Sequence, residues 1–159
     1  DALREFGALR GVHQPVDRAH RARRLVVDGN QAAFVDTGTS HSVPGLLAAL
    51  DALGVAPEQV DWVLVTHVHL DHAGGAGELM RHLPRARLAV HPRGARHLVD
   101  PAKLIAGSIA VYGEARYHAL YGEIVPVPEA RVHVVADAER ITLGGRTLEL
   151  VHTPGHALH

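Results

Sequence analysis

Residues 61–75 read DWVLVTHVHLDHAGG and carry the pattern that decides the fold. The apolar run that opens this stretch predicts a strand covered on both faces, and open α/β sheets bind ligands at the carboxyl ends of such strands. Side chains two apart in an extended segment point the same way, so His67 and His69 can present their imidazoles to one ion. The chain then turns into a helix, which aims Asp71 and His72 at a point close by.

The residue types in this cluster favour a metal site. Three imidazoles and one carboxylate so close in sequence are costly to desolvate, and a divalent metal compensates that cost with N and O donors that it prefers. A single histidine would more simply be an exposed loop residue, but the spacing H-x-H-x-D-H after an apolar strand makes that alternative a poor one. Gly74 and Gly75 permit a close approach at the start of the helix because no Cβ intrudes.

The patterns on either side of this stretch predict a mixed α/β fold. Two β-rich runs around an Asp-Gly pair are typical of a hairpin, and Ser42 is the expected N-cap of a helix that ends at Gly54. A strand, a helix and a strand within about 30 residues make a βαβ unit. The expected elements are a hairpin at 25–35, helices at 42–54 and 75–83, and strands at 61–66, 87–90, 131–136, 141–143 and 147–151.

Residues 91–128 interrupt this alternation. The segment has prolines near both ends and is too long for a plain connection, so it predicts a helical insertion. Tyr112, Tyr117 and Tyr121 lie within it, and tyrosines pack more often than they contact a substrate. We nevertheless expect that the insertion could act as a lid that caps the cleft and selects substrates.

Composition narrows the class of protein. A chain of 159 residues predicts one domain, and its formal charge of -1 argues against a protein that coats nucleic acid or an anionic membrane. A basic cluster at residues 18–24 lacks interleaved aromatic residues, so a solvated edge is the simpler interpretation. No apolar run is long enough to span a bilayer, and no signal peptide is visible, which predicts a cytoplasmic protein unless a leader has been removed. The chain has no cysteine but 14 histidines.

Three motifs resemble those of the metallo-β-lactamase-fold hydrolases. The first is Asp36-Thr37-Gly38 after a strand, the second is H-x-H-x-D-H at residues 67–72, and the third is Thr-Pro-Gly-His, which ends at His156. The resemblance runs from about Leu25 to His159, and the second motif is its most specific part. In this family Asp36 would support the metal-binding loop without ligating.

The resemblance implies which residues bind metal. It assigns one ion to His67, His69 and His156, and a second ion to Asp71 and His72. The expected cofactor is Zn²⁺, as one or two ions, with iron or manganese as alternatives. The family completes the second site with a bridging Asp and a further His from later strands.

The resemblance also implies an αββα sandwich built from two βαβ-rich halves. We expect residues 1–159 to form one incomplete domain of this type, mainly its N-terminal half with the insertion at 91–128. The bridging Asp and the last His have no candidates up to His159, so the second metal site is short of ligands. Full activity is therefore expected of a longer parent protein rather than of these residues alone.

The implied reaction is metal-dependent hydrolysis of a small molecule. Metal-bound hydroxide would cleave an ester, thioester, lactone or amide-type bond, as in glyoxalase-II-like and lactonase-like members, because the metal lowers the pKa of its bound water to about 7. Asp71 is the expected catalytic residue, which ligates and orients the nucleophile, while Asp36 holds the ligands in position. The lack of cysteine removes the β-lactamase subclass that uses a Cys ligand.

Three other functions remain open. An oxidoreductase resembling persulfide dioxygenases would keep a single iron on His67, His69 and His156. A nuclease, as in RNA-processing members, is disfavoured by the neutral charge. A metal-binding fragment without activity of its own would bind about one ion per chain and turn over no generic ester.

The remaining histidines carry weaker expectations. His152 and His159 could lie beside the site, and His41 is expected to be a polar loop residue near its mouth. The other histidines are interpreted as surface or core residues, namely His13, His20, His82, His91, His97, His118 and His133.

Overall fold

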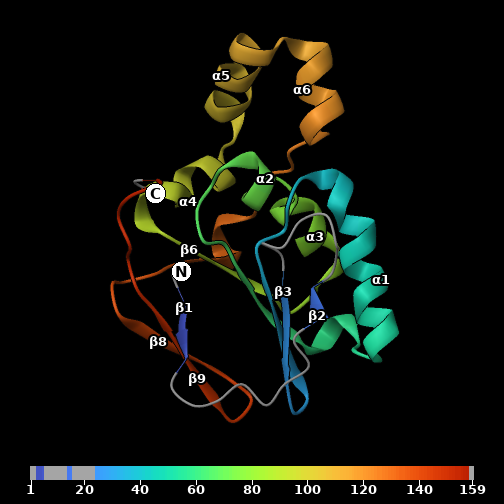
Figure 1. Ribbon diagram of the computed structural model, residues 1–159, viewed down its shortest axis with the longest axis vertical. Coiled ribbons are helices and arrows are strands. Elements are labelled where there is room, and N and C mark those ends of the chain that lie inside the picture. The colour runs from blue at the N-terminus through green and yellow to red at the C-terminus, as the bar shows by residue number, and fades with distance from the viewer. Residues whose placement is uncertain (1–2, 6–13, 16–23, 158–159) are drawn as a thin grey trace.

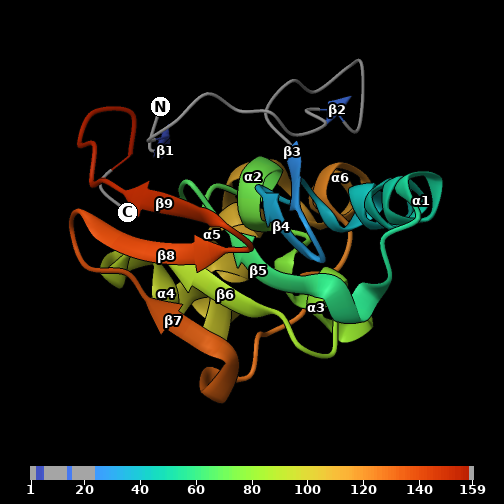
Figure 2. The same ribbon diagram turned by 90° about the horizontal axis from the view of Figure 1, so that it is seen from below.

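The computed structural model describes residues 3–5, 14–15 and 24–157. Within them, six strands form a sheet in the order β2-β3-β4-β5-β6-β7, and three form a second sheet in the order β1-β9-β8. The two sheets face each other, and helices cover the outer side of the larger sheet (Figures 1 and 2). The protein thus has the mixed α/β fold that the sequence predicts, with helices on one side of two stacked sheets.

The elements of the larger sheet alternate with helices along the chain. In order they are β2 (Gln14–Pro15), β3 (Arg24–Asp28), β4 (Gln31–Val35), α1 (Val43–Leu53), β5 (Val60–Leu64), α2 (Leu70–Ala73), α3 (Ala76–His82), β6 (Arg87–Val90), α4 (Pro92–Val99), α5 (Ala102–Tyr112), α6 (Glu114–Tyr121) and β7 (Val132–Val134). The smaller sheet consists of β1 (Leu3–Glu5), β8 (Glu139–Leu143) and β9 (Arg146–Leu150). Short 3-10 turns at Ser40–Ser42, Pro57–Gln59 and Glu129–Arg131 join some of them.

The sheet topology confirms the predicted hairpin and βαβ unit. Strands β3 and β4 pair antiparallel around a turn in which Gly29 has a positive φ of 58°. Strands β4, β5, β6 and β7 then pair parallel to one another in sequence order. Because parallel strands end at the same edge of a sheet, the segments that follow β4 and β5 lie side by side.

Two hydrophobic clusters hold the layers together. One joins the larger sheet to α1, α3 and α4 through residues such as Phe34, Leu46 and Leu79, which are fully buried. The other lies between the two sheets and includes Leu64 and Leu143. Strand β5 contributes to both clusters, as expected of the apolar run at its start.

The long segment between β6 and β7 folds into three helices. Helix α4 packs against the sheet, whereas α5 and α6 form a helical hairpin that extends beyond α2 at the top of the molecule (Figure 1). We call this pair the α5–α6 hairpin. Its role as a lid stays a prediction.

The structure differs from the expected elements in two places. The helix expected at 75–83 is preceded by the short helix α2, because the chain turns directly after His69. Residues 3–5 and 14–15 pair as edge strands, which the weak pattern of the first 24 residues did not indicate. His13, His20, His159 and most of the basic cluster lie outside the described residues. No helix in the described part of the chain is long and apolar enough to cross a membrane.

Candidate metal centre

The candidate site lies at the carboxyl ends of β4 and β5. Val35 is in register with Leu64, so Asp36 and Thr66 follow these neighbouring strands at the same edge. The backbone N–H of Asp36 donates to the carbonyl of Leu64 at 2.8 Å, which continues the strand pairing by one residue. Asp36 has a φ of 56°, in the left-handed region that non-glycine residues rarely adopt. Its side chain is thereby directed toward the loop after β5.

The Asp36 carboxylate joins three donors from that loop. Oδ1 accepts the backbone N–H of Thr66 at 2.8 Å, and both oxygens lie 3.0 Å from the Thr66 hydroxyl. Oδ2 accepts the Nδ1–H of His72 at 2.8 Å. The carboxylate is only 3% exposed, so these bonds are shielded from water. Asp36 therefore connects Thr66 and His72 through its carboxylate, while its expected role in supporting a metal-binding loop stays a prediction.

These hydrogen bonds select the tautomers of two histidines. The Thr66 hydroxyl donates its hydrogen bond to Asp36. Its oxygen is therefore left to accept the Nδ1–H of His67 at 3.1 Å. His67 Nε2 is left with a lone pair, and it is buried without a hydrogen-bond partner. An orphaned acceptor of this kind is costly unless an ion or donor compensates it. The same logic leaves the lone pair of His72 on Nε2.

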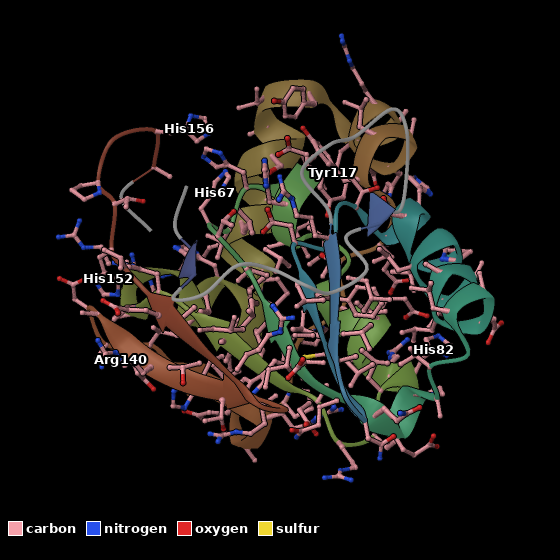
Figure 3. The ribbon with its side chains drawn as sticks, turned by 60° about the horizontal axis from the view of Figure 1, so that its bottom comes forward. His67, His82, Tyr117, Arg140, His152 and His156 are labelled. Carbon is pink, nitrogen blue, oxygen red and sulfur yellow. The ribbon has the colours of Figure 1, made fainter. Side chains whose placement is uncertain are left out.

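His67, His69 and His156 come together into a triad. Their potential ligand atoms all lie within 4.8 Å of one another. The ring centroids of His67 and His69 are 4.6 Å apart, and that of His156 lies 5.0 Å from His67 and 5.1 Å from His69. Figure 3 shows His156 reaching back from the segment after β9 toward His67. These three nitrogens, with the orphaned lone pair of His67 among them, could hold a metal ion such as zinc or iron.

Electrostatics keep the central imidazole neutral. Burial, followed by the neighbouring imidazoles of His72 and His69, lowers the pKa of His67 to about 4, against an opposing effect of Asp36. At neutral pH this ring carries no charge and offers its lone pair. A metal would therefore not have to displace a proton from it.

The backbone of the first motif is hydrogen-bonded to the segment around His72 and Gly75. The carbonyl of His72 accepts the N–H groups of Thr37 at 2.7 Å and Gly38 at 3.1 Å, and the Thr37 hydroxyl at 3.0 Å. Gly75 N–H donates to the carbonyl of Gly38 at 2.8 Å, and a Cβ on Gly75 would lie 2.7 Å from the carbonyl oxygen of Thr39. The close approach predicted at Gly75 is thus present, between the start of α3 and the first motif.

Asp71 and His72 lie next to the triad rather than within it. The ring of His72 is 4.1 Å from that of His67, and its Nε2 is 3.7 Å from Asp71 Oδ2. The Asp71 side chain is 66% exposed, so it lies open to solvent beside His72. The structure therefore brings all five expected ligand residues to one edge, but gathers three of them around a single point.

Tyr121 of α6 packs on the hydrophobic cluster that includes Leu70 of the loop after β5. Its pKa is raised to about 12, first by a hydrogen bond with the Tyr112 side chain, then by burial, and further by the charges of Tyr112 and Asp71.

Other residues have roles that the sequence indicated poorly. Thr66 links Asp36 to His67. In the sequence, this role was indicated only by the position of Thr66 between the strand and the first histidine. His152 bonds to the carbonyl of Val135 at 3.2 Å and packs 4.3 Å from the ring of His91, so within the described residues it belongs to a separate pair. His41 bonds to the carbonyl of His118 at 3.2 Å and thus contacts α6.

The comparisons with known proteins agree with this geometry. The model of the metallo-beta-lactamase superfamily matches residues 25–159, and the chain belongs to that family. A hydroxyacylglutathione hydrolase of Aeromonas salmonicida is 30% identical over 132 residues, which cover 83% of this chain. A metallo-beta-lactamase fold-containing protein of Sulfurisphaera tokodaii is 30% identical over 159 residues and covers 94% of the chain. MEM-A1, a subclass B3 metallo-beta-lactamase from a soil metagenome library, has a TM-score of 0.63 and 29% identity over 84% of the chain.

The chain is shorter than the proteins that it matches. The aligned regions make up 37% of the Aeromonas hydrolase, 57% of the Sulfurisphaera protein and 47% of MEM-A1. The chain thus spans between about a third and just over half of the length of these proteins.

Proposed function

We propose that this protein is the metal-binding part of a metal-dependent hydrolase that cleaves an ester, thioester, lactone or amide-type bond in a small molecule. The observation that carries the proposal is the histidine triad with the buried, unpaired Nε2 of His67. The Aeromonas relative is named a hydroxyacylglutathione hydrolase and MEM-A1 a metallo-beta-lactamase, and both names support a carbonyl-type substrate.

Each residue of the site has a defined task in this proposal. His67, His69 and His156 bind the ion, and Asp36 keeps His67 and His72 in the tautomers that point Nε2 toward the site. A divalent metal held there supplies Lewis acidity, which lowers the pKa of water to about 7 and neutralises charge that develops on a carbonyl oxygen. Asp71, exposed beside His72, accepts a hydrogen bond from the attacking water and orients it.

His72 and Asp71 provide the start of a second site. His72 Nε2 and Asp71 Oδ2 are 3.7 Å apart, so both could contact one ion after a small side-chain adjustment. We propose that this second position is weaker than the triad, because two donors hold an ion less tightly than three. A parent protein could add further ligands.

The test begins with metal binding. Zinc titrated into metal-free protein by calorimetry should show one tight site per chain. Replacing His67 with Gln should weaken it by more than about a hundredfold, since even the partners of ligands contribute 10–100-fold. His82→Gln is the matched control, because His82 lies on α3, far from the triad (Figure 3), and pairs with Glu78. Equal zinc affinity of the two variants would contradict the assignment.

The second stage tests hydrolysis. A hydroxyacyl thioester of glutathione, a lactone and a β-lactam are offered to the zinc-loaded chain, and to a longer parent protein where one exists. We expect cleavage of at least one substrate, with loss of activity on chelation and recovery when zinc is restored. Hydrolysis that is unchanged after complete chelation would refute the proposal.

A single-ion oxidoreductase is the second candidate. It is favoured by one observation, that the triad is the one group of three mutually close ligand atoms among the described residues. Elemental analysis of purified protein separates the two candidates. Iron together with oxygen uptake on a persulfide supports the oxidoreductase, whereas zinc together with carbonyl cleavage supports the hydrolase.

A further inference from the structure

The α5–α6 hairpin carries an apolar surface that nothing in the described structure covers. Three of the four large apolar residues that are exposed among the described residues lie on it, namely Val111, Tyr112 and Leu120, which are 75%, 42% and 43% exposed. Helix α5 contains a single charged residue, Lys103, and none of its residues is fully buried. Exposed large apolar residues that gather on one element are a candidate binding surface.

The hairpin that carries these residues also packs against the loop of the candidate metal centre. A small hydrophobic cluster links the metal-binding loop to the hairpin, and its buried members are Leu70, Tyr117 and Ile124. Leu70 stands between His69 and Asp71 in the sequence. The partly buried residues that pack on this cluster come mainly from the hairpin, and they are Leu104, Ile105, Ile109 and Tyr121. The hairpin therefore packs directly on the loop that carries His69 and Asp71.

The base of the hairpin is fixed at the rim of the site. Ser40 Oγ donates to the carbonyl of Tyr121 at 2.9 Å, and His41 Nε2 lies 3.2 Å from the carbonyl of His118. Gly122, with a φ of 69°, follows directly, and a Cβ there would collide with the Ser40 hydroxyl. The loop that follows Asp36 thus holds the end of α6, so the apolar surface has a defined position relative to the metal centre.

Two tyrosines lie on this surface. The rings of Tyr112 and Tyr121 are 5.8 Å apart, one from each helix of the hairpin. The ring of Tyr121 also packs on the buried cluster that includes Leu70 of the loop after β5. Tyrosine rings offer flat apolar area with a polar edge, which suits the junction between a reacting carbonyl and an apolar chain.

We propose that the α5–α6 hairpin binds the apolar acyl or aryl portion of the substrate, so that the protein prefers substrates with a long apolar chain next to the scissile carbonyl. This proposal rests on the proposed function, because the metal centre is what would hold the carbonyl end. The hairpin is then a specificity element, and Tyr112, Val111 and Leu120 are its exposed contacts.

Charge at the hairpin favours a small ligand over a membrane. Glu114 and Arg116 of α6 and Lys103 of α5 are all exposed, so charges of both signs surround the apolar residues. Surfaces that bind anionic lipid instead place an excess of Lys and Arg around their apolar residues. A single chain of methylene groups needs no such excess.

The test measures how binding depends on chain length. Sodium butyrate and sodium octanoate are titrated into the protein by calorimetry, once metal-free and once loaded with zinc. Full burial of one methylene strengthens binding by about fourfold, so partial burial of four should make octanoate at least about tenfold tighter than butyrate. The double variant Val111→Ser/Leu120→Ser should lose that preference and bind butyrate as before. Tyr112→Ala should reduce it.

Val134→Ser is the matched control, because Val134 is 50% exposed on β7, away from the hairpin. It should leave the octanoate preference unchanged. Equal affinity for both acids, or an equal loss in the Val134 variant, would overturn the proposal. Flotation of the protein with phosphatidylglycerol vesicles would also overturn it. So would sedimentation that shows a dimer for the natural protein and a monomer for the double variant. Because the preference is measured in metal-free protein as well, its failure is distinguishable from a failure of zinc to bind, which would overturn the proposed hydrolase instead.

Discussion

The Nδ1 of His72 lies 2.8 Å from Oδ2 of Asp36, and the same carboxylate binds both the backbone N–H and the hydroxyl of Thr66. One buried acid therefore sets the orientation of two imidazoles, His72 directly and His67 through Thr66. This arrangement makes Asp36 a positioning residue, and we expect its replacement to lower the affinity of the site for zinc.

Asp36→Asn tests that role. The amide has a single acceptor oxygen, so at least one of the three donors loses its partner. We expect zinc affinity to fall by about 10–100-fold, the usual cost of losing a partner of a ligand, and the free energy of unfolding of the metal-free protein to fall by about 1–3 kcal/mol. Calorimetry and urea denaturation measure the two effects. Asp51→Asn, on the exposed side of α1, should change neither, and an unaltered zinc affinity in Asp36→Asn would argue against the positioning role.

Gly75→Ala tests the packing behind the metal-binding loop. The added Cβ would lie 2.7 Å from the carbonyl oxygen of Thr39, so the loop or α3 must shift. Overpacking of this kind costs about 1–3 kcal/mol, and we expect weaker zinc binding along with it. Gly45→Ala is the counterpart on α1, where a Cβ meets nothing within 4 Å. It should leave zinc binding alone and stabilise the helix by up to about 1 kcal/mol, and a similar loss in both variants would remove the steric explanation.

Ser40→Ala tests the anchor of the α5–α6 hairpin. Loss of the bond to the carbonyl of Tyr121 should cost about 0.5–1.5 kcal/mol locally. We expect faster hydrogen exchange in α6, with unchanged exchange in β4 and β5. Ser108→Ala provides the comparison, because Ser108 bonds only within α5, to the carbonyl of Leu104. The Ser108→Ala variant should show no faster hydrogen exchange in α6, and equally fast exchange in both variants would contradict the anchor.

Asp28 links the turn after β3 to the turn between β8 and β9. Its carboxylate accepts Arg146 Nε at 3.0 Å and the N–H of Gly145 at 2.7 Å. The bond to Arg146 first, and then the bond to Gly145, hold the pKa of Asp28 below its usual value of 3.8. The stabilising effect is therefore present above about pH 4 and is lost as the pH falls through the lowered pKa.

The difference in melting temperature between the natural protein and Asp28→Asn should accordingly be largest above pH 5 and shrink toward pH 3. Thermal unfolding followed by circular dichroism at several pH values measures it. A difference that grows on acidification would have the wrong sign for this pairing.

The sequence predicted the central strands and the metal-binding loop well, because their signals are local. The apolar run before His67 and the Asp-Gly pair at the β3–β4 turn specify strand and hairpin without reference to distant residues. The H-x-H-x-D-H spacing likewise places its imidazoles by backbone geometry alone. The ligand roles themselves stay predictions.

Contacts between distant segments were not predictable in the same way. Arg131 donates to the backbone carbonyls of Met80 in α3 and of Leu83 and Ala86 in the loop that follows, yet nothing near Arg131 in sequence indicates these partners. The pairing of β1 with β9 joins opposite ends of the chain, and its short strand carries little pattern. Thr66 was missed because a hydroxyl relay becomes visible only once Asp36 and His67 are placed together.

The position of His156 has a consequence for how the protein holds together. It stands 89 residues after His67, and only the packing of β8 and β9 on the larger sheet carries it to the triad. An ion bound by both would cross-link two layers that are otherwise joined by side-chain packing and turn contacts, and so would restrict the unfolded chain much as a disulfide does in proteins that have cysteine. In this cysteine-free chain, the imidazoles that we propose as metal ligands would then also cross-link the two sheets.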